Sequence, residues 1–327
     1  MSNLTKFIFE GLPVRGMLVR LTGAWQEVLQ RRQALGAHPP EVRALLGEMA
    51  AAGVLMQANI KFNGALILQV MGDGPVKLAV AEVQPDLGFR ATAKVVGEVP
   101  GGARLAAMLN VHGQGRCAIT LDPKDRFPGQ QPYQGVVPLS ASSDGAPPAP
   151  LQQVQEVLEH YMLQSEQLDT KLVLAANDEV AAGLLIQRLP VEGEANLEGS
   201  ARARKNEDDI GLSEAYNRIA ILAATLTREE LLTLPSDQIM HRLFWEETLR
   251  VFEPTATPHF ACTCSRERVR GMLRGLGREE SDGLILERGV VEVGCEFCGQ
   301  QYHFDAVDVG EMFTPPLDQP PTIVGVQ

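Results

Sequence analysis

The first two thirds of the chain alternate between short apolar runs and polar turns, which predicts a mixed α and β domain. The run VRGMLVRL at 14–21 has the apolar and β-branched content of a strand. The stretches 24–34 and 41–53, on either side of a Pro-Pro pair, are typical of helices. Further strands are expected at 64–70, 76–83, 89–96, 116–122, 133–139, 170–177 and 180–189. We therefore expect residues 1–208 to form one N-terminal domain, a sheet with packed helices.

Turn-forming residues separate several of these runs. The cluster Gly-Asp-Gly-Pro at 72–75 lies between two apolar runs and indicates a hairpin. The segment SASSDGAPPAP at 140–150 is predicted to be a loop, because it is rich in Pro, Ser and Gly. A helix is expected after it, since one face at helical spacing carries Leu151, Val154, Leu158, Tyr161 and Met162.

Residues 209–257 have a different pattern, which we interpret as a helical linker after the charged stretch ARARKNEDDIG. One face of its first helix carries Ala215, Ile219, Leu222, Ala223 and Leu226. Thr227 and Glu230 have capping-box spacing, and a helical pattern resumes over 236–252. These helices are amphipathic but too short to form a core of their own, so they must pack on another part of the protein.

Four of the five cysteines lie in two tight pairs, Cys262 with Cys264 and Cys295 with Cys298. Tetrahedral Zn²⁺ needs four donors, and a tight turn can present two of them at once. The spacing predicts a four-thiolate zinc site in a small C-terminal domain, 258–313, followed by a flexible tail, 314–327. Two histidines, His259 and His303, are alternate ligands, but four cysteines already complete a structural site.

The residues alone leave two interpretations of this site open, a plain zinc ribbon and a redox switch. C-x-x-C is an established redox spacing, and a C-x-C pair can also approach disulfide geometry, so each pair could close once the metal leaves. A domain of under 60 residues has a marginal core, whereas structural zinc contributes roughly 10–16 kcal/mol. Loss of the metal should therefore unfold this domain and leave the linker without support.

Composition narrows the possible functions. A net charge of −12 and a pI near 5.1 disfavour nucleic acid and anionic membranes as partners. No signal peptide and no run of about 18 apolar residues is evident, so we expect a cytoplasmic protein with reduced thiols. Cys117 is expected to be an ordinary buried thiol. Motif fragments such as GQGRCA lack the flanking elements of a nucleotide site, and no enzyme is expected.

Several segments together resemble the heat shock protein 33 family, the redox-regulated 33-kDa chaperonins. The resemblance runs from about Val14 to Phe313 and is carried by IKFNGALILQVMGDGPV, LEHYMLQSEQLDT, AAGLLIQRLP, RLFWEETLRVFEP, FACTCSRERV and VEVGCEFCGQQYHFDAVDV. It implies an α+β fold with a helical linker and a zinc domain. It also implies one Zn²⁺ per reduced, inactive chain.

The same resemblance implies the mode of action. Oxidants would expel the zinc and form the disulfides Cys262–Cys264 and Cys295–Cys298, and the zinc domain and linker would unfold. The protein would then dimerise and hold unfolding client proteins without ATP. Among linker residues, Ile219, Leu222 and Leu226 are candidate client contacts, because their exposure would create an apolar patch. The alternative is a zinc-ribbon thiol–disulfide oxidoreductase.

Overall fold

The computed structural model divides the chain into two compact units, Met1–Ala261 and Cys262–Gln327. It describes residues 2–33, 35–125, 127, 129–142, 147–190, 212–254 and 256–314. Each unit has its own hydrophobic core.

The first unit contains a five-stranded antiparallel sheet. Its strands, in spatial order, are β10 (Thr170–Ala176), β11 (Ala181–Arg188), β2 (Val14–Leu21), β1 (Asn3–Phe9) and β12 (Leu249–Phe252). Both faces of this sheet are covered. Along β11, alternate residues point to two different apolar clusters, which explains why its sequence is an unbroken apolar run rather than an alternating one.

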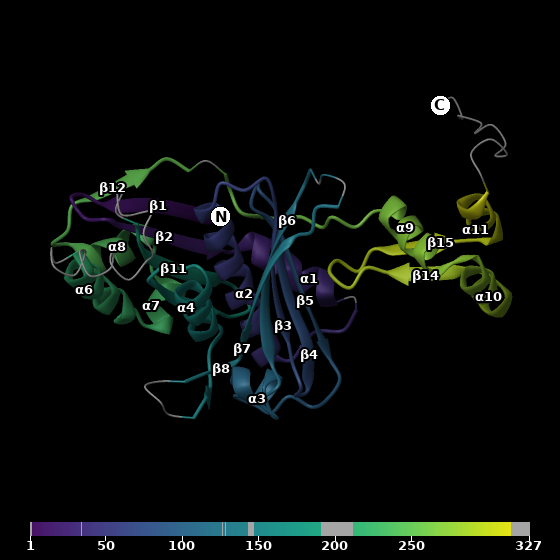
Figure 1. The fold of residues 1–327 in the computed structure, drawn as a ribbon, viewed down its shortest axis with the longest axis horizontal. Helices are drawn as coiled ribbons and strands as arrows, with labels where there is room; N and C mark the ends of the chain where they lie inside the picture. The colour runs from purple at the N-terminus through teal and green to yellow at the C-terminus, as the bar shows by residue number, and fades with distance from the viewer. Residues whose placement is uncertain are drawn as a thin grey trace. The chain divides into compact units, whose positions relative to one another are not determined.

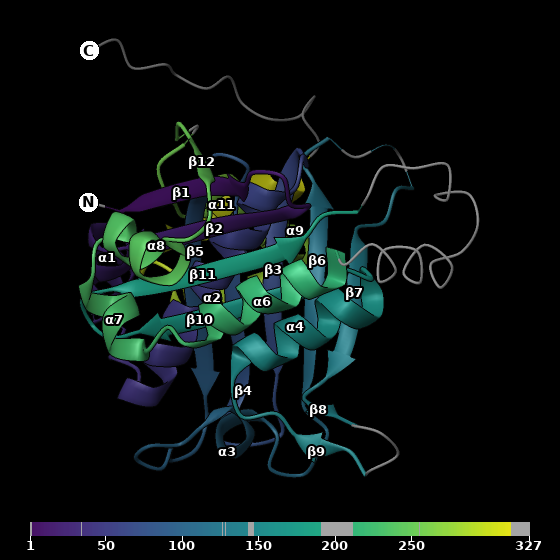
Figure 2. The ribbon, with the colours of Figure 1, turned by 90° about the vertical axis from the view of Figure 1, so that its left-hand side faces the viewer.

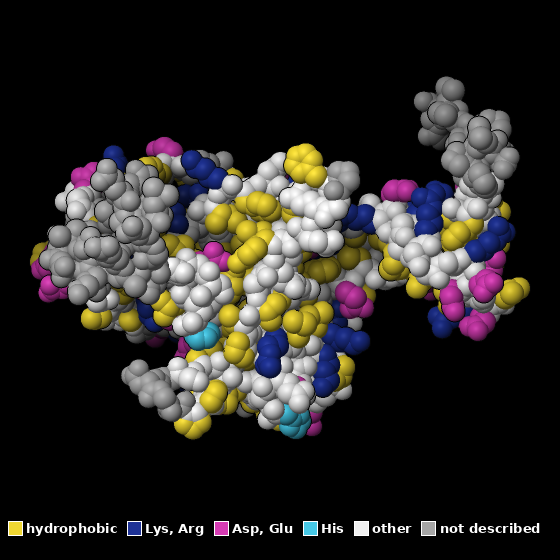
Figure 3. All heavy atoms as spheres, viewed as in Figure 1, with side chains coloured by type: hydrophobic (Ala, Val, Ile, Leu, Met, Phe, Trp, Pro, Cys, Tyr) yellow, Lys and Arg dark blue, Asp and Glu magenta, His cyan; other side chains and the backbone are white. Residues whose placement is uncertain are grey.

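A six-stranded sheet forms the other layer of the unit (Figure 1). Its spatial order is β13 (His259–Phe260), β5 (Gly88–Val95), β4 (Val76–Val83), β3 (Gly64–Met71), β6 (Arg116–Pro123) and β7 (Tyr133–Pro138). The predicted hairpin at 72–75 is confirmed as the β3–β4 turn. Buried and half-buried positions alternate along β3, so one face of this sheet is partly open. Figure 3 shows hydrophobic side chains at this surface. Met71 of β3 and Val136 of β7 are exposed.

The helix α2 (Pro40–Asn59) lies between the two sheets and contacts strands of both. The strands can approach it closely because small residues occupy much of its surface. A Cβ added at Gly47 would lie 2.4 Å from Ala176 Cβ and 3.1 Å from Trp25 Cζ2, both in the packed core. Glycine is therefore required here by the closeness of helix and sheet.

The first unit contains five further elements between β2 and β10. They are α1 (Gly23–Gln33), α3 (Leu105–Leu109), α4 (Val154–Ser165), β8 (Ser140–Ala141) and β9 (Ala149–Pro150). The helices predicted at 24–34 and after the Pro-rich segment are confirmed as α1 and α4. The ends of the predicted loop at 140–150 pair as β8 and β9, so that prediction was only partly right. Residues 143–146 lie outside the described part.

Three helices cover the outer face of the five-stranded sheet (Figure 2). They are α6 (Leu212–Ala224), α7 (Arg228–Thr233) and α8 (Ser236–Phe244). Their apolar faces enter a cluster with β1, β2, β10 and β11 that includes Ile219 and Leu226. The capping box at the start of α7 is confirmed, because Thr227 Oγ1 accepts from Glu230 N–H while Glu230 Oε2 accepts from Thr227 N–H.

The helical pattern predicted over 236–252 was wrong in its second half. Helix α8 ends at Phe244, and Leu249–Phe252 is the strand β12, antiparallel to β1. Sequence reasoning did not predict β1, and this segment becomes a strand because it pairs with the edge of β1. The Phe244 ring packs on Phe7 and Phe9 of β1, with ring centroids 6.1 and 5.1 Å away. Tertiary pairing here overrides helical periodicity.

The second unit is small and built around a hairpin. It consists of α9 (Arg266–Leu276), α10 (Arg278–Arg288), β14 (Val291–Gly294), β15 (Gln301–Phe304) and α11 (Ala306–Phe313). Among its described residues up to Thr314, five are buried in the core: Leu273, Val291, Phe304, Val309 and Met312. Such a core is too small to stabilise a domain without additional cross-linking.

The expected α+β class, with an N-terminal sheet domain and a small four-cysteine C-terminal unit, is confirmed. The finer division into 1–208, 209–257, 258–313 and 314–327 stays a prediction. The boundary at 208/209 and residues 315–327 of the predicted tail lie outside the described residues. No described helix is long and apolar enough to cross a membrane.

Substitution Gly47→Ala should destabilise the first unit by about 1–3 kcal/mol, because its Cβ would overlap Ala176 in the core. The free energy of unfolding in urea measures this effect. The matched control is Gly23→Ala in α1, where an added Cβ meets nothing within 4 Å. That substitution should be neutral or stabilise by up to about 1 kcal/mol, and equal effects at both sites would contradict the packing argument.

Candidate metal centre

Two short segments supply the four cysteines. Cys262 and Cys264 directly precede α9, whose N-cap is Ser265. The Ser265 hydroxyl accepts a hydrogen bond from the backbone N–H of Arg268. This N-cap starts the helix directly after Cys264. The helix therefore fixes the C-terminal end of the C-x-C segment.

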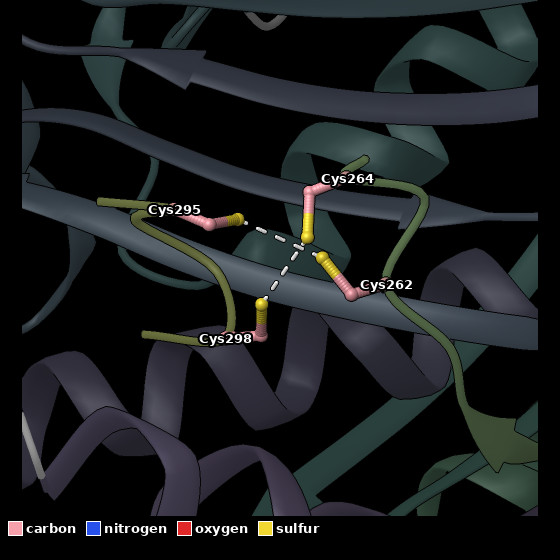
Figure 4. Close-up of side chains that lie close together, drawn as sticks. All are labelled: Cys262, Cys264, Cys295 and Cys298. Carbon is pink, nitrogen blue, oxygen red and sulfur yellow. Dashed lines mark hydrogen bonds between the residues drawn. The ribbon is translucent and has the colours of Figure 1, made fainter. Parts of the chain in front are cut away.

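The second pair lies in the tight turn between β14 and β15. The N–H of Cys295 donates to the Gln300 carbonyl at 2.9 Å, and the N–H of Gly299 donates to the Cys295 carbonyl at 2.8 Å. Gly299 has φ +75°, a conformation that favours glycine, so the turn needs a glycine directly after Cys298. The turn presents both sulfurs on the same side (Figure 4).

The four sulfur atoms converge from these two segments. Cys262 Sγ lies 3.7 Å from Cys295 Sγ, and Cys264 Sγ lies 3.4 Å from Cys298 Sγ (Figure 4). All four lie within 4.8 Å of one another, and all four residues are half-buried. A tetrahedral zinc ion with Zn–S bonds of about 2.3 Å separates its sulfurs by about 3.8 Å. The donor set and its spacing thus fit a zinc ion.

In the metal-free cluster, the surroundings of the second cysteine pair disfavour the ionised thiolates. Burial raises the pKa of Cys295 and of Cys298, while backbone N–H groups of Phe297 and Gln300 act in the opposite direction. Without a metal ion these thiols are protonated at neutral pH. A bound cation would stabilise the thiolates and release their protons.

One polar side chain contacts a sulfur directly and was missed by sequence reasoning. The Tyr302 hydroxyl donates to Cys264 Sγ at 3.2 Å. This hydrogen bond is the main reason that the pKa of Tyr302 is raised, to about 12. The only sequence signal was its position in β15, on the hairpin that carries the second cysteine pair.

Arg266, the second residue after Cys264, has structural contacts within the C-terminal unit. Arg266 donates to the His303 carbonyl and to Asp308 Oδ2, both at 2.7 Å. Its guanidinium also lies 4.3 Å from the centre of the Phe304 ring. Arg266 therefore joins α9 to β15 and α11, and its charge is matched by a carboxylate near the core.

The two histidines considered as alternate ligands are not part of the cluster of potential metal ligands. His303 Nδ1 lies 3.4 Å from Glu292 Oε1 on the hairpin, and His259 Nδ1 lies 3.1 Å from the Thr257 carbonyl. Cys117 is buried in β6, and burial raises the pKa of its thiol to about 12, as expected of an inert thiol.

Comparison with known proteins identifies the family. The family model described as Hsp33 protein matches residues 2–305. The chain belongs to the Hsp33 family.

Relatives of similar length support this assignment. The chain is 47% identical over 312 residues to a 33 kDa chaperonin of Chromobacterium violaceum, an alignment that covers 95% of this chain and 94% of the relative. It is 40% identical over 320 residues to a 33 kDa chaperonin of Methylobacillus flagellatus, covering 98% and 97%.

Among solved structures, the 33 kDa chaperonin of Thermotoga maritima matches with a TM-score of 0.71 and 20% identity, covering 95% of this chain and 98% of that one. At this identity the match shows a common fold.

Zinc affinity should fall as the pH falls, because the pKa values of Cys295 and Cys298 are raised and protons compete with the metal for these sulfurs. If at least two protons are released per zinc, affinity changes by about a hundredfold per pH unit. Competition with a chromogenic chelator from pH 8 to pH 6 measures the slope. An affinity independent of pH would contradict protonated thiols in the metal-free site.

Matched cysteine substitutions locate the metal. Cys298→Ser should lose zinc to a chelator that the wild-type protein resists, whereas Cys117→Ala should retain about one zinc ion per chain. Retention of zinc by both variants would mean that the metal lies elsewhere.

Proposed function

We propose that this protein is a redox-regulated, ATP-independent holdase chaperone. Its reduced, zinc-bound form is inactive, and oxidation activates it to bind unfolding proteins and prevent their aggregation during oxidative and heat stress. The observation that carries the proposal is a four-sulfur cluster in a unit with only five buried core residues, in a chain of the Hsp33 family. The chaperonin names of the relatives support the chaperone role.

Energetics support zinc as the stabilising element of the C-terminal unit. Structural zinc contributes roughly 10–16 kcal/mol to small zinc-dependent folds, comparable to or above the roughly 5–15 kcal/mol of a typical domain. The cluster joins the segment before α9 to the β14–β15 turn, which are otherwise about 30 residues apart in sequence. Removal of the metal removes this connection, and the small core cannot replace it.

Oxidation would remove the metal, and the pairing of the new disulfides would determine whether the segment before α9 and the β14–β15 turn are again linked. Disulfides Cys262–Cys264 and Cys295–Cys298 close very short loops and leave the two segments separate. The closest sulfurs in the reduced site belong to different pairs, Cys262 with Cys295 and Cys264 with Cys298. Disulfides between those atoms would close loops of more than 30 residues and stabilise the folded unit by about 3–4 kcal/mol. Activation by unfolding therefore requires the pairing within each motif.

The helices α6 to α8 supply the surface that unfolding would uncover. Ile219 and Leu226 are buried against the five-stranded sheet, and Leu222 packs at the edge of the same cluster. These three residues, our candidate client contacts, can meet a client only after the helices detach. Detachment would also uncover the sheet residues beneath them, including Phe7 and Phe9.

Two arginines hold α7 on the sheet in the resting form. Arg20 donates to the carbonyls of Leu231, Leu232 and Leu234 at 2.7, 2.9 and 2.9 Å, at the C-terminal end of α7. Arg228, at the other end, donates to the Ala176 carbonyl and lies 3.4 Å from Glu48 Oε1. The Arg20 bonds satisfy carbonyls at the end of α7, whereas Arg228 joins α7 to the end of β10. All of these contacts would have to break on activation.

The proposal includes the setting in which the protein works. We propose a cytoplasmic, non-enzymatic protein that forms a homodimer when oxidised and has no nucleic-acid or membrane partner. Its negative net charge supports the absence of a nucleic-acid or anionic-membrane partner.

Light scattering of thermally unfolding citrate synthase tests the function. Protein kept reduced with zinc should leave aggregation unchanged, whereas protein treated with peroxide at raised temperature should suppress most of it, with release of zinc. Cys117→Ala should respond like the wild-type protein, because Cys117 is remote from the cluster in sequence and buried in the sheet. Equal suppression of aggregation by the reduced and oxidised forms would contradict the proposal. Catalytic turnover of a disulfide substrate would favour a thiol–disulfide oxidoreductase instead.

Disulfide pairing in the oxidised form can be read from tryptic peptides. Cys262 and Cys264 lie in the peptide 251–266, and Cys295 and Cys298 lie in 289–327, which has no internal Lys or Arg. We expect two separate peptides, each lighter by two hydrogens, in mass spectra of the activated protein. A single cross-linked species containing both peptides would contradict the pairing within each motif.

A further inference from the structure

A cavity of about 130 Å³ lies between the two sheets of the first unit, beside the C-terminal end of α2. Its walls come from β2, β10 and β11 of one sheet, from β3, β6 and β7 of the other, and from α2 and α4. Most of the lining residues are aliphatic or Met, among them Leu66, Ile119 and Leu185. Ile60 and Tyr133 also line the cavity and are exposed, so it opens to solvent beside them. Because an apolar cavity of about 150 Å³ binds benzene, this one has room for a body of about six carbon atoms.

One cation lines this largely apolar cavity. Arg15 of β2 is the only Lys or Arg among the described residues that line it. Arg15 Nε and Nη2 both donate to Oε1 of Gln187, a fully buried amide on the neighbouring strand β11. The same oxygen accepts from Asn59 Nδ2 at 2.8 Å, and Gln187 Nε2 donates to the Thr170 hydroxyl at 2.8 Å. Neutral hydrogen-bonding groups therefore hold the guanidinium in place at the cavity.

Positive charge at this end of α2 is not balanced by carboxylates of the described residues. Arg15 forms no ion pair with them, and neither does Lys6, whose Nζ donates to the Ala58 carbonyl at 2.7 Å. Burial lowers the pKa of both side chains, and the charge of Arg15 lowers the pKa of Lys6 further. The C-terminal end of the α2 dipole offsets only about half a charge. An anion at Arg15 would complete the balance.

The carboxylate at the opening of the cavity does not supply that anion. Glu166 lines the cavity, but its Oε1 accepts from the hydroxyls of Tyr161 and Tyr133 at 2.7 and 3.2 Å, and Glu166 forms no ion pair with Arg15. Its side chain is exposed, so water solvates its charge. The inner end of the cavity therefore carries a guanidinium, and the outer end carries two phenols and a solvated carboxylate.

We propose that this cavity binds a small monocarboxylate with a compact apolar body, of the type of benzoate or hexanoate. The ligand carboxylate accepts from the N–H groups of Arg15 that Gln187 does not use, in a charge-assisted pair. The apolar body fills the space between Leu66, Ile119 and Leu185. The bound ligand stabilises the first unit, because the cavity exists only while both sheets are packed around α2. This site involves no cysteine and is independent of the proposed chaperone function.

Titration of benzoate into the reduced, full-length protein tests the inference, with ligand-observed NMR as the readout. The uncharged comparison is benzamide, which has nearly the same shape. Benzoate should bind with a Kd on the order of 0.1–1 mM, as expected for so small a ligand. It should bind at least about tenfold more tightly than benzamide, since hydrogen bonds to a charged group contribute about that factor or more. Hexanoate should displace benzoate, because both occupy one site.

Matched arginine substitutions locate the site. Arg15→Met removes the charge and keeps an apolar side chain of similar length. It should weaken benzoate binding by about tenfold or more and leave benzamide binding unchanged. The control is Arg116→Met, which removes an exposed guanidinium from β6 that does not line the cavity. That variant should bind benzoate like the wild-type protein. Far-UV circular dichroism establishes that each variant is folded, and the comparison of ligands in the wild-type protein stands even if Arg15→Met is not.

Four outcomes would overturn the inference. The first is no benzoate binding at millimolar concentrations, and the second is equal affinity for benzoate and benzamide. The third is an equal loss of benzoate binding, or none, in both arginine variants, since general surface charge would explain the former. The fourth is tighter binding of the cation benzylamine, which would place charge recognition at Glu166. The titrations use reduced protein and measure no aggregation, so a failure of the proposed chaperone function would not change their result.

Discussion

The convergence of four sulfur atoms is the constraint on which the C-terminal unit depends. Two segments that are distant in sequence meet there, in a unit with five buried apolar residues in its described part. The first unit differs in kind, because a helix buried between two sheets gives it an extensive core that needs no metal. The protein therefore combines one part stabilised by packing with one part in which four thiols converge beside a small core, which is the basis of the proposed redox switch.

The stabilising groups of the C-terminal unit are arranged around the cysteines. The Ser265 cap starts α9 directly after the first pair, and Gly299 permits the turn directly after the second. Arg266 connects α9 with the Phe304 ring and with Asp308 of α11. These contacts orient the two segments that carry the sulfurs. Because they involve few residues, they add little stability when the metal is absent.

Sequence reasoning succeeded where the information was local or periodic. The cysteine spacing was sufficient to predict the cluster, and apolar runs predicted most strands of both sheets. It failed for β1 and β12, because the second half of 236–252 keeps a helical pattern and becomes a strand only through the free edge of β1. The Tyr302 contact was also beyond reach. A tyrosine in a strand pattern predicts a packed ring, and only the folded hairpin brings its hydroxyl to the sulfur.

The position of the short strand β12 along the chain determines which part of the five-stranded sheet would lose its structure first. In chain order, the segment that leaves Cys262 toward the N-terminus first forms β13, which pairs with β5 over only two residues. It then passes Pro254 and enters β12, whose four residues pair with β1. Loss of order spreading from the cysteines would reach this edge strand before any of the three helices behind it. Few backbone hydrogen bonds hold so short an edge strand. Strand β12 would therefore separate early and leave the backbone N–H and C=O groups along one edge of β1 unpaired. In the proposed redox switch, oxidation of the cysteines would in this way weaken a sheet whose strands contain no cysteine.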